Sequence, residues 1–469
     1  MTATLMILVL YACALVAVGV LVGRLVRSSG DFFVAGRNLP AGMVFVTLLA
    51  ANIGAGSTVG ATGLGYTYGL SAWWWVGSAA IGSILFGLLV APKMHRLARA
   101  GGHLTVGDFL EARFDRGVRG MISLILWFAA LAGLSGQLIA MAVVLQVAAG
   151  VPKSWGCSIG GLILIAYYSS GGLRSSIWVN LLELAVLLVG FTVALPFALS
   201  AAGGLQRLAA GAADPSGYGS LFGGPIFGWL IVLVPSFLIS PGLIQKTYGA
   251  RSDRAARRAV LWNAAALFLF AWIPPLLGMS VRALRPTLSN PDLALPTLMA
   301  ELLPLWLGGL LLGAVFAAEI STADAFLFML STSLSKDLYK SFVRPAASDA
   351  RLLQVTRRTS VLAGLAGTAL AILLPGVIAA LTVFYSILTV ALLVPLLAGL
   401  YWMRPRSIHA KTAILAAVGT LIGTQFAWRG TPAGSWLPVC LALSAALCVF
   451  ALAPWIPGPA HALSEARRE

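Results

Sequence analysis

Apolar residues along this chain fall into long blocks, each close to the length of a membrane-spanning helix and separated from the next by a short polar loop. A helix needs about 20 mainly apolar residues to cross the hydrocarbon core of a bilayer. Thirteen blocks approach or exceed that length, near 4–24, 41–66, 71–93, 118–149, 155–170, 176–201, 226–247, 259–281, 299–333, 359–375, 377–402, 411–427 and 434–455. The pattern predicts an all-α polytopic membrane protein with about 13 transmembrane helices.

The composition agrees with this class. The 469 residues are 59% hydrophobic and only 10% charged, and the mean hydropathy is +0.93. Soluble domains contain about 25% charged residues. We therefore expect residues 1–469 to form a single transmembrane domain, without a soluble domain of any size.

The loops explain the net charge of +16. If the N-terminus lies outside and the loops alternate, 26 of the 31 lysines and arginines fall on the cytoplasmic side, and the outer side keeps Lys153, Arg207, Arg282, Arg285 and Arg429. Basic residues gather in cytoplasmic loops. We therefore predict a cell-membrane protein with its N-terminus outside, its C-terminus in the cytoplasm and no nucleic-acid partner. The first block precedes its basic flank, Arg24 and Arg27, so it is interpreted as a retained helix rather than a cleaved signal.

A glycine-rich run, AANIGAGSTVG at 50–60, interrupts the second apolar block. Its glycines, Gly54, Gly56 and Gly60, lower the cost of leaving the helical conformation. Backbone that leaves the helix at membrane depth must be buried in protein or line a cavity. The run therefore indicates a solute or ion site within the membrane, although close packing of two helices through small residues is an alternative explanation.

A second interruption occurs in the block at 226–247, where PSFLISPG at 235–242 contains two prolines. Proline removes a helix hydrogen bond and clashes with the preceding turn. The interrupted blocks each open a set of five, 41–201 and 226–402, and an odd number makes the two sets face opposite ways. Inverted repeats that open with interrupted helices are typical of secondary transporters. We therefore expect an extra helix within 1–30, two repeats, and two further helices within 411–455.

Polar residues inside the apolar blocks provide candidate ion-binding and proton-binding groups. The hydroxyls of Ser321 and Thr322, with carbonyls freed by the first break, suit a hard cation that takes oxygen ligands. Bonding back to their own helical turn is the alternative. Glu183 and Glu319 are carboxylates in apolar segments, where ionisable residues are costly and are usually functional. They could carry protons, compensate a cation or pair with a polar neighbour.

Several motifs resemble those of the sodium:solute symporter family. They are the run at 50–57 with GLGY at 63–66, GGLR at 171–174, STAD at 321–324 leading to STSLSKDLY at 331–339, and DFFVAGR at 31–37. The resemblance extends from about residue 30 to about residue 405. It implies the leucine-transporter fold, with one helix before a five-plus-five core and further helices after it, and sodium-coupled symport as the activity.

The resemblance also implies the ligands of a sodium site. They fall on the carbonyls of Ala50, Ile53 and Ala318 and on the hydroxyls of Ser321 and Thr322. The family often has an aspartate close to this site, where this chain has Asn180. A neutral amide keeps an oxygen but loses the compensating charge, so we expect weak binding of about one sodium ion. Glu183, Glu319 and Asp324 are the more distant candidates for coupling.

The solute is expected beside the two breaks. Candidate lining residues are Asn52, Gly56 and Ser57 at the first break, Gln137 in the block at 118–149, and Ser236, Phe237 and Ser240 at the second break. The tryptophans at 73–75 could shape an outer vestibule, but tryptophan also favours the membrane interface. Half-helix N-termini can hold a carboxylate without an arginine. A small organic solute, such as a carboxylate or an amino-acid-like compound, is therefore the preferred substrate class.

The main hypothesis is a secondary active transporter that imports a small organic solute with sodium by alternating access. Proton-coupled or uncoupled transport through Glu183 or Glu319 is one alternative. A transporter-fold membrane sensor or partner-regulated module is another, but the short tail after about residue 456 has no kinase or receiver domain to support it. No paired acidic motif, histidine-rich metal motif or nucleophile elbow indicates an enzyme. The expected partners are the solute and the lipid bilayer, and no obligate protein partner is evident.

Overall fold

The computed structural model describes residues 37–170, 173–210, 218–402, 405–428 and 436–452, together with the single positions 6, 431 and 434. Over this part of the chain the structure is helical, and its β-pairing is one isolated parallel bridge between Leu39 and Ala250. The predicted all-α class is therefore confirmed. The predicted first helix within 1–30, most of the motif at 31–37, the glycines of GGLR at 171–172 and Arg429 lie outside the described residues.

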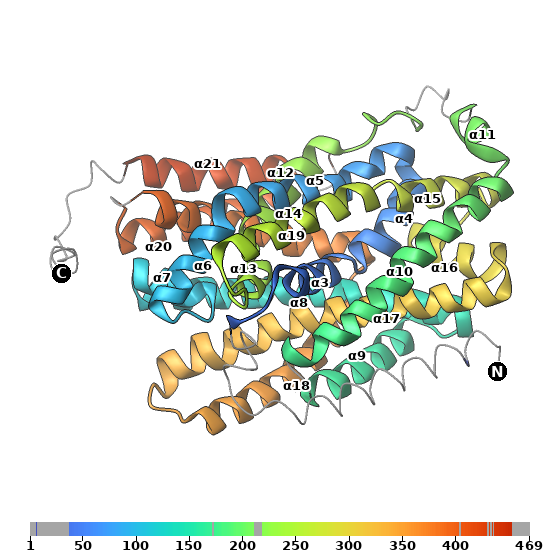
Figure 1. Ribbon diagram of the computed structural model, residues 1–469. Coiled ribbons are helices and arrows are strands. Elements are labelled where there is room, and N and C mark those ends of the chain that lie inside the picture. The colour runs from blue at the N-terminus through green and yellow to red at the C-terminus, as the bar shows by residue number, and fades with distance from the viewer. Residues whose placement is uncertain are drawn as a thin grey trace.

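The helices form one bundle in which most elements run side by side (Figure 1). In chain order they are α3 (Ala41–Asn52), α4 (Ala61–Tyr68), α5 (Trp73–Leu85), α6 (Ala91–Gly101), α7 (Val106–Arg113), α8 (Arg116–Ala149), α9 (Lys153–Ser170), α10 (Leu173–Ala201), α11 (Gly204–Ala210), α12 (Ile226–Ile239), α13 (Pro241–Thr247), α14 (Asp253–Phe270), α15 (Ile273–Leu284), α16 (Ala294–Thr297), α17 (Leu305–Thr332), α18 (Asp349–Leu373), α19 (Val377–Tyr401), α20 (Ser407–Ala427) and α21 (Leu437–Leu452). Short π-helical or 3₁₀ segments join or extend several of them, namely η2 (Gly56–Gly60), η3 (Gly69–Ala72), η4 (Phe86–Val90), η6 (Pro291–Leu293), η7 (Leu298–Leu302) and η8 (Ser333–Val343).

Eight helical stretches among the described residues are long and apolar enough to cross a membrane. They are Gly56–Gly101, Arg116–Ala149, Glu183–Ala201, Ile226–Thr247, Asp253–Leu284, Leu305–Val343, Val377–Tyr401 and Ser407–Ala427. Three shorter apolar helices, Ala41–Asn52, Lys153–Ala166 and Leu437–Leu452, accompany them. The chain is therefore a multi-pass membrane protein.

Two of the predicted blocks differ from the helices that form. The block at 299–333 begins as η7, and α17 starts only at Leu305, because Leu303 and Pro304 adopt extended backbone and proline restricts the residue before it to that region. The block at 259–281 divides into α14 and α15 near Trp272, just before the prolines at 274 and 275.

The two interrupted helices meet in the middle of the bundle. The first is α3 followed by η2 and α4, and the second is α12 followed by α13. The half-helices α3 and α13 pack against each other near the centre (Figure 1). The bridge between Leu39 and Ala250 joins the chain just before α3 to the chain just after α13. By contrast, α20 and α21 pack on each other and on α19 at the edge of the bundle.

An ion-pair cluster joins three elements at one end of the bundle. Arg119 of α8 contacts Asp108 of α7 at 3.0 Å, Glu111 at 2.6 Å and Asp337 of η8 at 2.6 Å. Lys336 pairs with Asp108 at 2.5 Å. Burial alone would raise the pKa of Asp108, but Lys336 and Arg119 hold it below its ordinary value. The cluster therefore fastens α7 and η8 to α8 through charges that are largely shielded from solvent.

Candidate ion and solute sites

The first break opens between α3 and η2. Helix α3 ends at Asn52, and Ile53 adopts extended backbone with φ −96° and ψ 90°. The hydroxyl of Ser57 accepts from the Gly54 N–H at 3.1 Å and lies 3.0 Å from the Asn52 carbonyl. The Gln137 Oε1 atom of α8 accepts from the Ala55 N–H at 2.8 Å. Side chains from the same break and from α8 therefore replace part of the lost helical hydrogen bonding.

Gly54 allows this break to approach α17 closely. A Cβ atom at this position would lie 2.3 Å from the Thr322 Oγ1 atom and 2.8 Å from the Gln137 Oε1 atom. Both distances are shorter than van der Waals contact. Any side chain at position 54 would thus push the broken backbone away from α17 and α8.

Ser321 and Thr322 of α17 bond across to other helices rather than back to their own turn. The Thr322 hydroxyl lies 3.1 Å from the Ala50 carbonyl and 3.3 Å from the Ile53 carbonyl, both at the end of α3. The Ser321 hydroxyl donates to the Asn180 Oδ1 atom of α10 at 2.8 Å. The two hydroxyls therefore connect the broken helix, α10 and α17 at one point.

A small cavity of about 10 Å³ lies at this point. It is lined by Ala50, Ile53, Glu183, Leu184, Leu187, Ala318 and Ser321. Four of the five predicted sodium ligands line it, and the fifth, Thr322, bonds two of the same carbonyls. Most of the lining surface is apolar, and Leu184 and Leu187 contribute to it. The only atoms that the lining residues could offer as metal ligands are carbonyl, hydroxyl and carboxylate oxygens, which fit a hard cation such as sodium rather than a metal that prefers nitrogen or sulfur.

The four candidate coupling residues lie in three different places. Asn180 and Glu183 are both buried on α10 beside this cavity. Glu319 accepts from the Thr58 hydroxyl at 2.8 Å and so helps to hold η2 in place. Asp324 lies close enough to Lys246 of α13 for their charges to interact. Sequence spacing alone could not distinguish these surroundings.

Two larger cavities adjoin the breaks. The first, of about 60 Å³, is lined by Ala51, Asn52, Ser236, Phe237, Ser240, Gly242, Leu243, Lys246, Ala325, Phe326, Met329, Phe384 and Tyr385. The second, of about 40 Å³, is lined by Ala51, Asn52, Gly54, Gly56, Ser57, Trp75, Val76, Ala79, Gln137, Leu233, Phe237, Leu267, Thr322, Phe326, Leu381 and Tyr385. All seven predicted solute-lining residues line one or both cavities. Asn52 and Phe237 line both, so the two spaces are neighbours.

Several lining residues were not predicted. Lys246 is counted as a cytoplasmic loop charge in the sequence, but its side chain is buried and donates to the Thr47 carbonyl at 2.8 Å. Trp75, one of the tryptophans assigned an interfacial alternative, is only 4% exposed and packs edge-on against Trp229 and Tyr385. Asn263 of α14 does not line either cavity, but it accepts from the amide of the lining residue Asn52 at 3.0 Å. The signal that could have found Lys246 is its position inside the apolar block at 226–247, within the half-helix α13 rather than in the loop that follows.

A helical membrane bundle with two broken helices, and with three cavities beside the breaks, is typical of a membrane transporter. The sequence model of the sodium:solute symporter family matches residues 32–417, and the chain belongs to this family. It is therefore a sodium:solute symporter by family and not an enzyme.

Relatives and solved structures agree with this assignment. A sodium/glucose cotransporter of Vibrio parahaemolyticus is 25% identical, with 90% of this chain and 84% of that protein covered. A sodium/pantothenate symporter of Escherichia coli (strain K12) is 29% identical, with 83% of this chain and 84% of that protein covered. The structure of a Na⁺-coupled sialic acid symporter in a substrate-bound outward-open state has a TM-score of 0.79 at 18% identity and covers 97% of this chain and 98% of that chain. The last likeness shows the shared fold.

Proposed function

We propose that this protein imports a small organic solute together with one sodium ion by alternating access. The observation that carries the proposal is the shared use of the first break. Ala50 and Ile53 of this break line the small cavity beside Ser321, while Asn52, between them, lines both larger cavities. A change in the backbone of this break therefore acts on both sites, which is what coupling of two ligands requires. The related glucose and pantothenate cotransporters are named for sodium.

The solute that suits the larger cavities is a small carboxylate or an amino-acid-like compound. The amide and hydroxyl residues Asn52, Gln137 and Ser240 line these cavities together with aromatic residues such as Trp75 and Tyr385. Lys246 is a cationic lining residue of the first cavity, and its ammonium group has donors to spare beyond its bond to Thr47. A solute with one anionic end and one apolar end matches this combination.

Proton coupling is the second candidate, and one observation favours it. Glu183 and Glu319 each have one buried carboxylate oxygen without a hydrogen-bond partner among the described residues. A protonated carboxyl group avoids the cost of burying an unpaired charge. The experiment below is therefore designed to separate the two ions.

Flux measurements in proteoliposomes test the proposal. A panel of labelled carboxylates, amino acids, sugars and quaternary ammonium compounds is supplied with an inward sodium gradient. We expect at least one solute to accumulate, and a tenfold gradient should support up to about tenfold accumulation at one-to-one stoichiometry and zero membrane potential. Replacing sodium by N-methylglucamine should abolish the accumulation. Undiminished accumulation on a pH gradient in sodium-free buffer would instead establish the proton as the driving ion.

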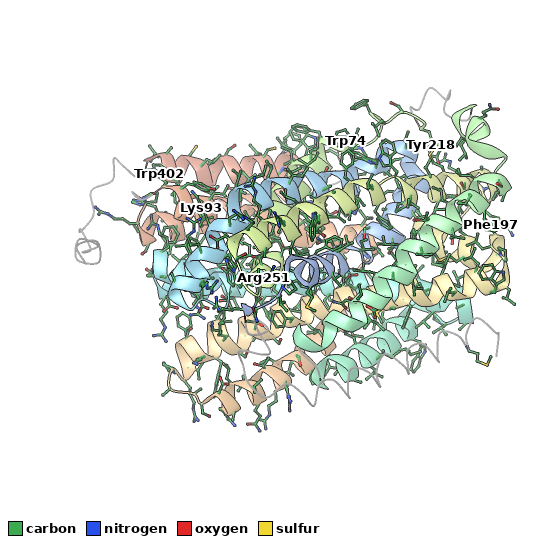
Figure 2. All side chains as sticks on the ribbon, viewed as in Figure 1. Trp74, Lys93, Phe197, Tyr218, Arg251 and Trp402 are labelled. Carbon is green, nitrogen blue, oxygen red and sulfur yellow. The ribbon has the colours of Figure 1, made fainter. Side chains whose placement is uncertain are left out.

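We further propose that the chain has thirteen membrane helices in the cell membrane, with the N-terminus outside and the C-terminus in the cytoplasm. The proposed parts are an extra helix within 1–30, inverted repeats at 41–201 and 226–402, and two helices within 411–455. Lys93, Arg251 and Trp402 lie toward one end of the bundle and Tyr218 and Phe197 toward the other (Figure 2), as expected if basic loops gather at the cytoplasmic end. A cysteine at position 254 should react with impermeant maleimide only from the cytoplasmic side. Labelling from outside would show that the orientation is the opposite of the one proposed.

A further inference from the structure

Glu183 occupies an unusual position beside the small cavity that Ala50, Ile53, Ala318 and Ser321 also line. It lies on α10, is 3% exposed, and shares the lining of this cavity with the candidate ligand residues Ala50, Ile53 and Ala318. Its Oε2 atom is buried and has no hydrogen-bond partner among the described residues. The Ser321 hydroxyl lies within reach of the same carboxylate. A carboxylate oxygen with unsatisfied lone pairs therefore belongs to a residue that lines a small and mostly apolar cavity, whose other polar side chain is Ser321.

No protein cation balances this carboxylate in the part of the chain that the structure describes. The ionisable group whose charge acts on Glu183 is Asp324, which has the same sign. Lys246 is also a buried cation, but its charge interacts with Asp324 and its ammonium group donates to the Thr47 carbonyl. A buried carboxylate without a counter-charge is strongly destabilising. A cation bound in the cavity would remove that cost.

The other candidate coupling residues do not place a carboxylate at this cavity. Glu319 accepts from Thr58 and does not line this cavity. Asn180 is one helical turn before Glu183, and residues three apart share a helix face. Its amide oxygen accepts from Ser321 at 2.8 Å. Asn180 thus holds the Ser321 hydroxyl in position, while the negatively charged residue on this face of α10 is Glu183, one turn later.

We propose that Glu183 is the anionic ligand of the cation site in this protein. Its Oε2 atom would coordinate sodium together with the carbonyl and hydroxyl oxygens already named, and Asn180 acts as a positioning residue for Ser321. This inference rests on the proposed sodium coupling. With Asn180 alone, the ligand shell of the sodium ion would be neutral and sodium binding would be weak. With Glu183 as a ligand, the shell carries one negative charge.

Sodium binding to the purified full chain tests the proposal without any solute. Binding is followed by isothermal titration and by the sodium-dependent shift of the unfolding temperature, at constant ionic strength maintained with N-methylglucamine chloride. We expect Glu183→Gln to raise the half-saturating sodium concentration by at least about tenfold, because one direct charge–charge attraction is lost. The matched control is Glu301→Gln, the same chemical change at an exposed carboxylate that pairs with Arg285. It should leave the sodium concentration unchanged.

A second variant keeps the test decisive if Glu183→Gln is unstable. The double change Asn180→Asp with Glu183→Gln moves the carboxylate back by one turn, and it should bind sodium more tightly than Glu183→Gln alone. Equal sodium affinity of wild type and a folded Glu183→Gln variant would overturn the inference and leave sodium coupling intact. Absence of sodium binding to the wild type would overturn the proposed function and this inference with it.

Discussion

Replacing Ser321 and Thr322 together with alanine should abolish sodium-stimulated uptake while leaving the protein folded. The two hydroxyls connect α17 with the end of α3 and with α10 beside the small cavity that Ser321 lines. Each polar contact to a charged group is worth about 1.5–3 kcal/mol. Loss of both should raise the half-saturating sodium concentration by more than about 100-fold. The measurement is initial solute uptake as a function of external sodium.

The same helix supplies a matched control for this pair. Ser331 and Thr332 are also adjacent hydroxyl residues of α17, but they bond to the Phe328 carbonyl of their own turn, at 3.2 Å and 2.6 Å. Changing both to alanine should leave the sodium dependence close to that of the wild type. If the Ser321/Thr322 variant keeps wild-type sodium dependence, these hydroxyls do not bind the coupling ion.

Arg119→Met should cause the largest loss of stability among single substitutions at the charged end of the bundle. The arginine side chain is 8% exposed and pairs with three carboxylates on α7 and η8. Its removal leaves Asp108 and Asp337 buried with too little positive charge, and breaking a buried pair in this way costs about 3–5 kcal/mol. The unfolding temperature in detergent should fall accordingly. Arg116→Met is the control, because Arg116 stacks on Phe342 and an exposed contact of this kind contributes only about 0.5–1 kcal/mol.

The pH dependence of stability provides an independent check on this cluster. In the folded protein the pKa of Asp108 lies below its ordinary value, because Lys336 and Arg119 outweigh burial. A carboxyl group with a lowered folded-state pKa stabilises the protein above its unfolded-state pKa, and this contribution is lost as the pH falls through the folded-state pKa. Arg119→Met removes part of the cause, so its stability should decline less on acidification than that of the wild type. An equal decline in both proteins would show that Asp108 does not depend on Arg119.

The sequence by itself determined the class of fold and the positions of its two irregularities. Long blocks of apolar residues and a low charge content predict a helical membrane protein, because a helix satisfies its backbone polar groups internally inside the bilayer. Gly54 and Gly56 mark the first break, and Pro235 and Pro241 flank the second, because these residues either tolerate or enforce departure from a helix. The structure places both interruptions there. The hydroxyl pair at 321–322 was also found from sequence, through its resemblance to a family motif.

Tertiary structure alone decided which polar groups meet. A helix inside a membrane bundle is apolar on the side that faces lipid and on the side that faces protein, so hydrophobic periodicity gives little information on where Asn180, Glu183 and Glu319 point. Packing of α10 against α3 and α17 places Glu183 at the same small cavity as Ser321, whereas Glu319 lies beside Thr58. The burial of Lys246 was likewise decided by the tertiary structure. Its charge suggests a loop in the sequence, but the approach of α13 to α3 buries it against Thr47, because only the folded bundle supplies the carbonyl and the carboxylate that make this burial tolerable.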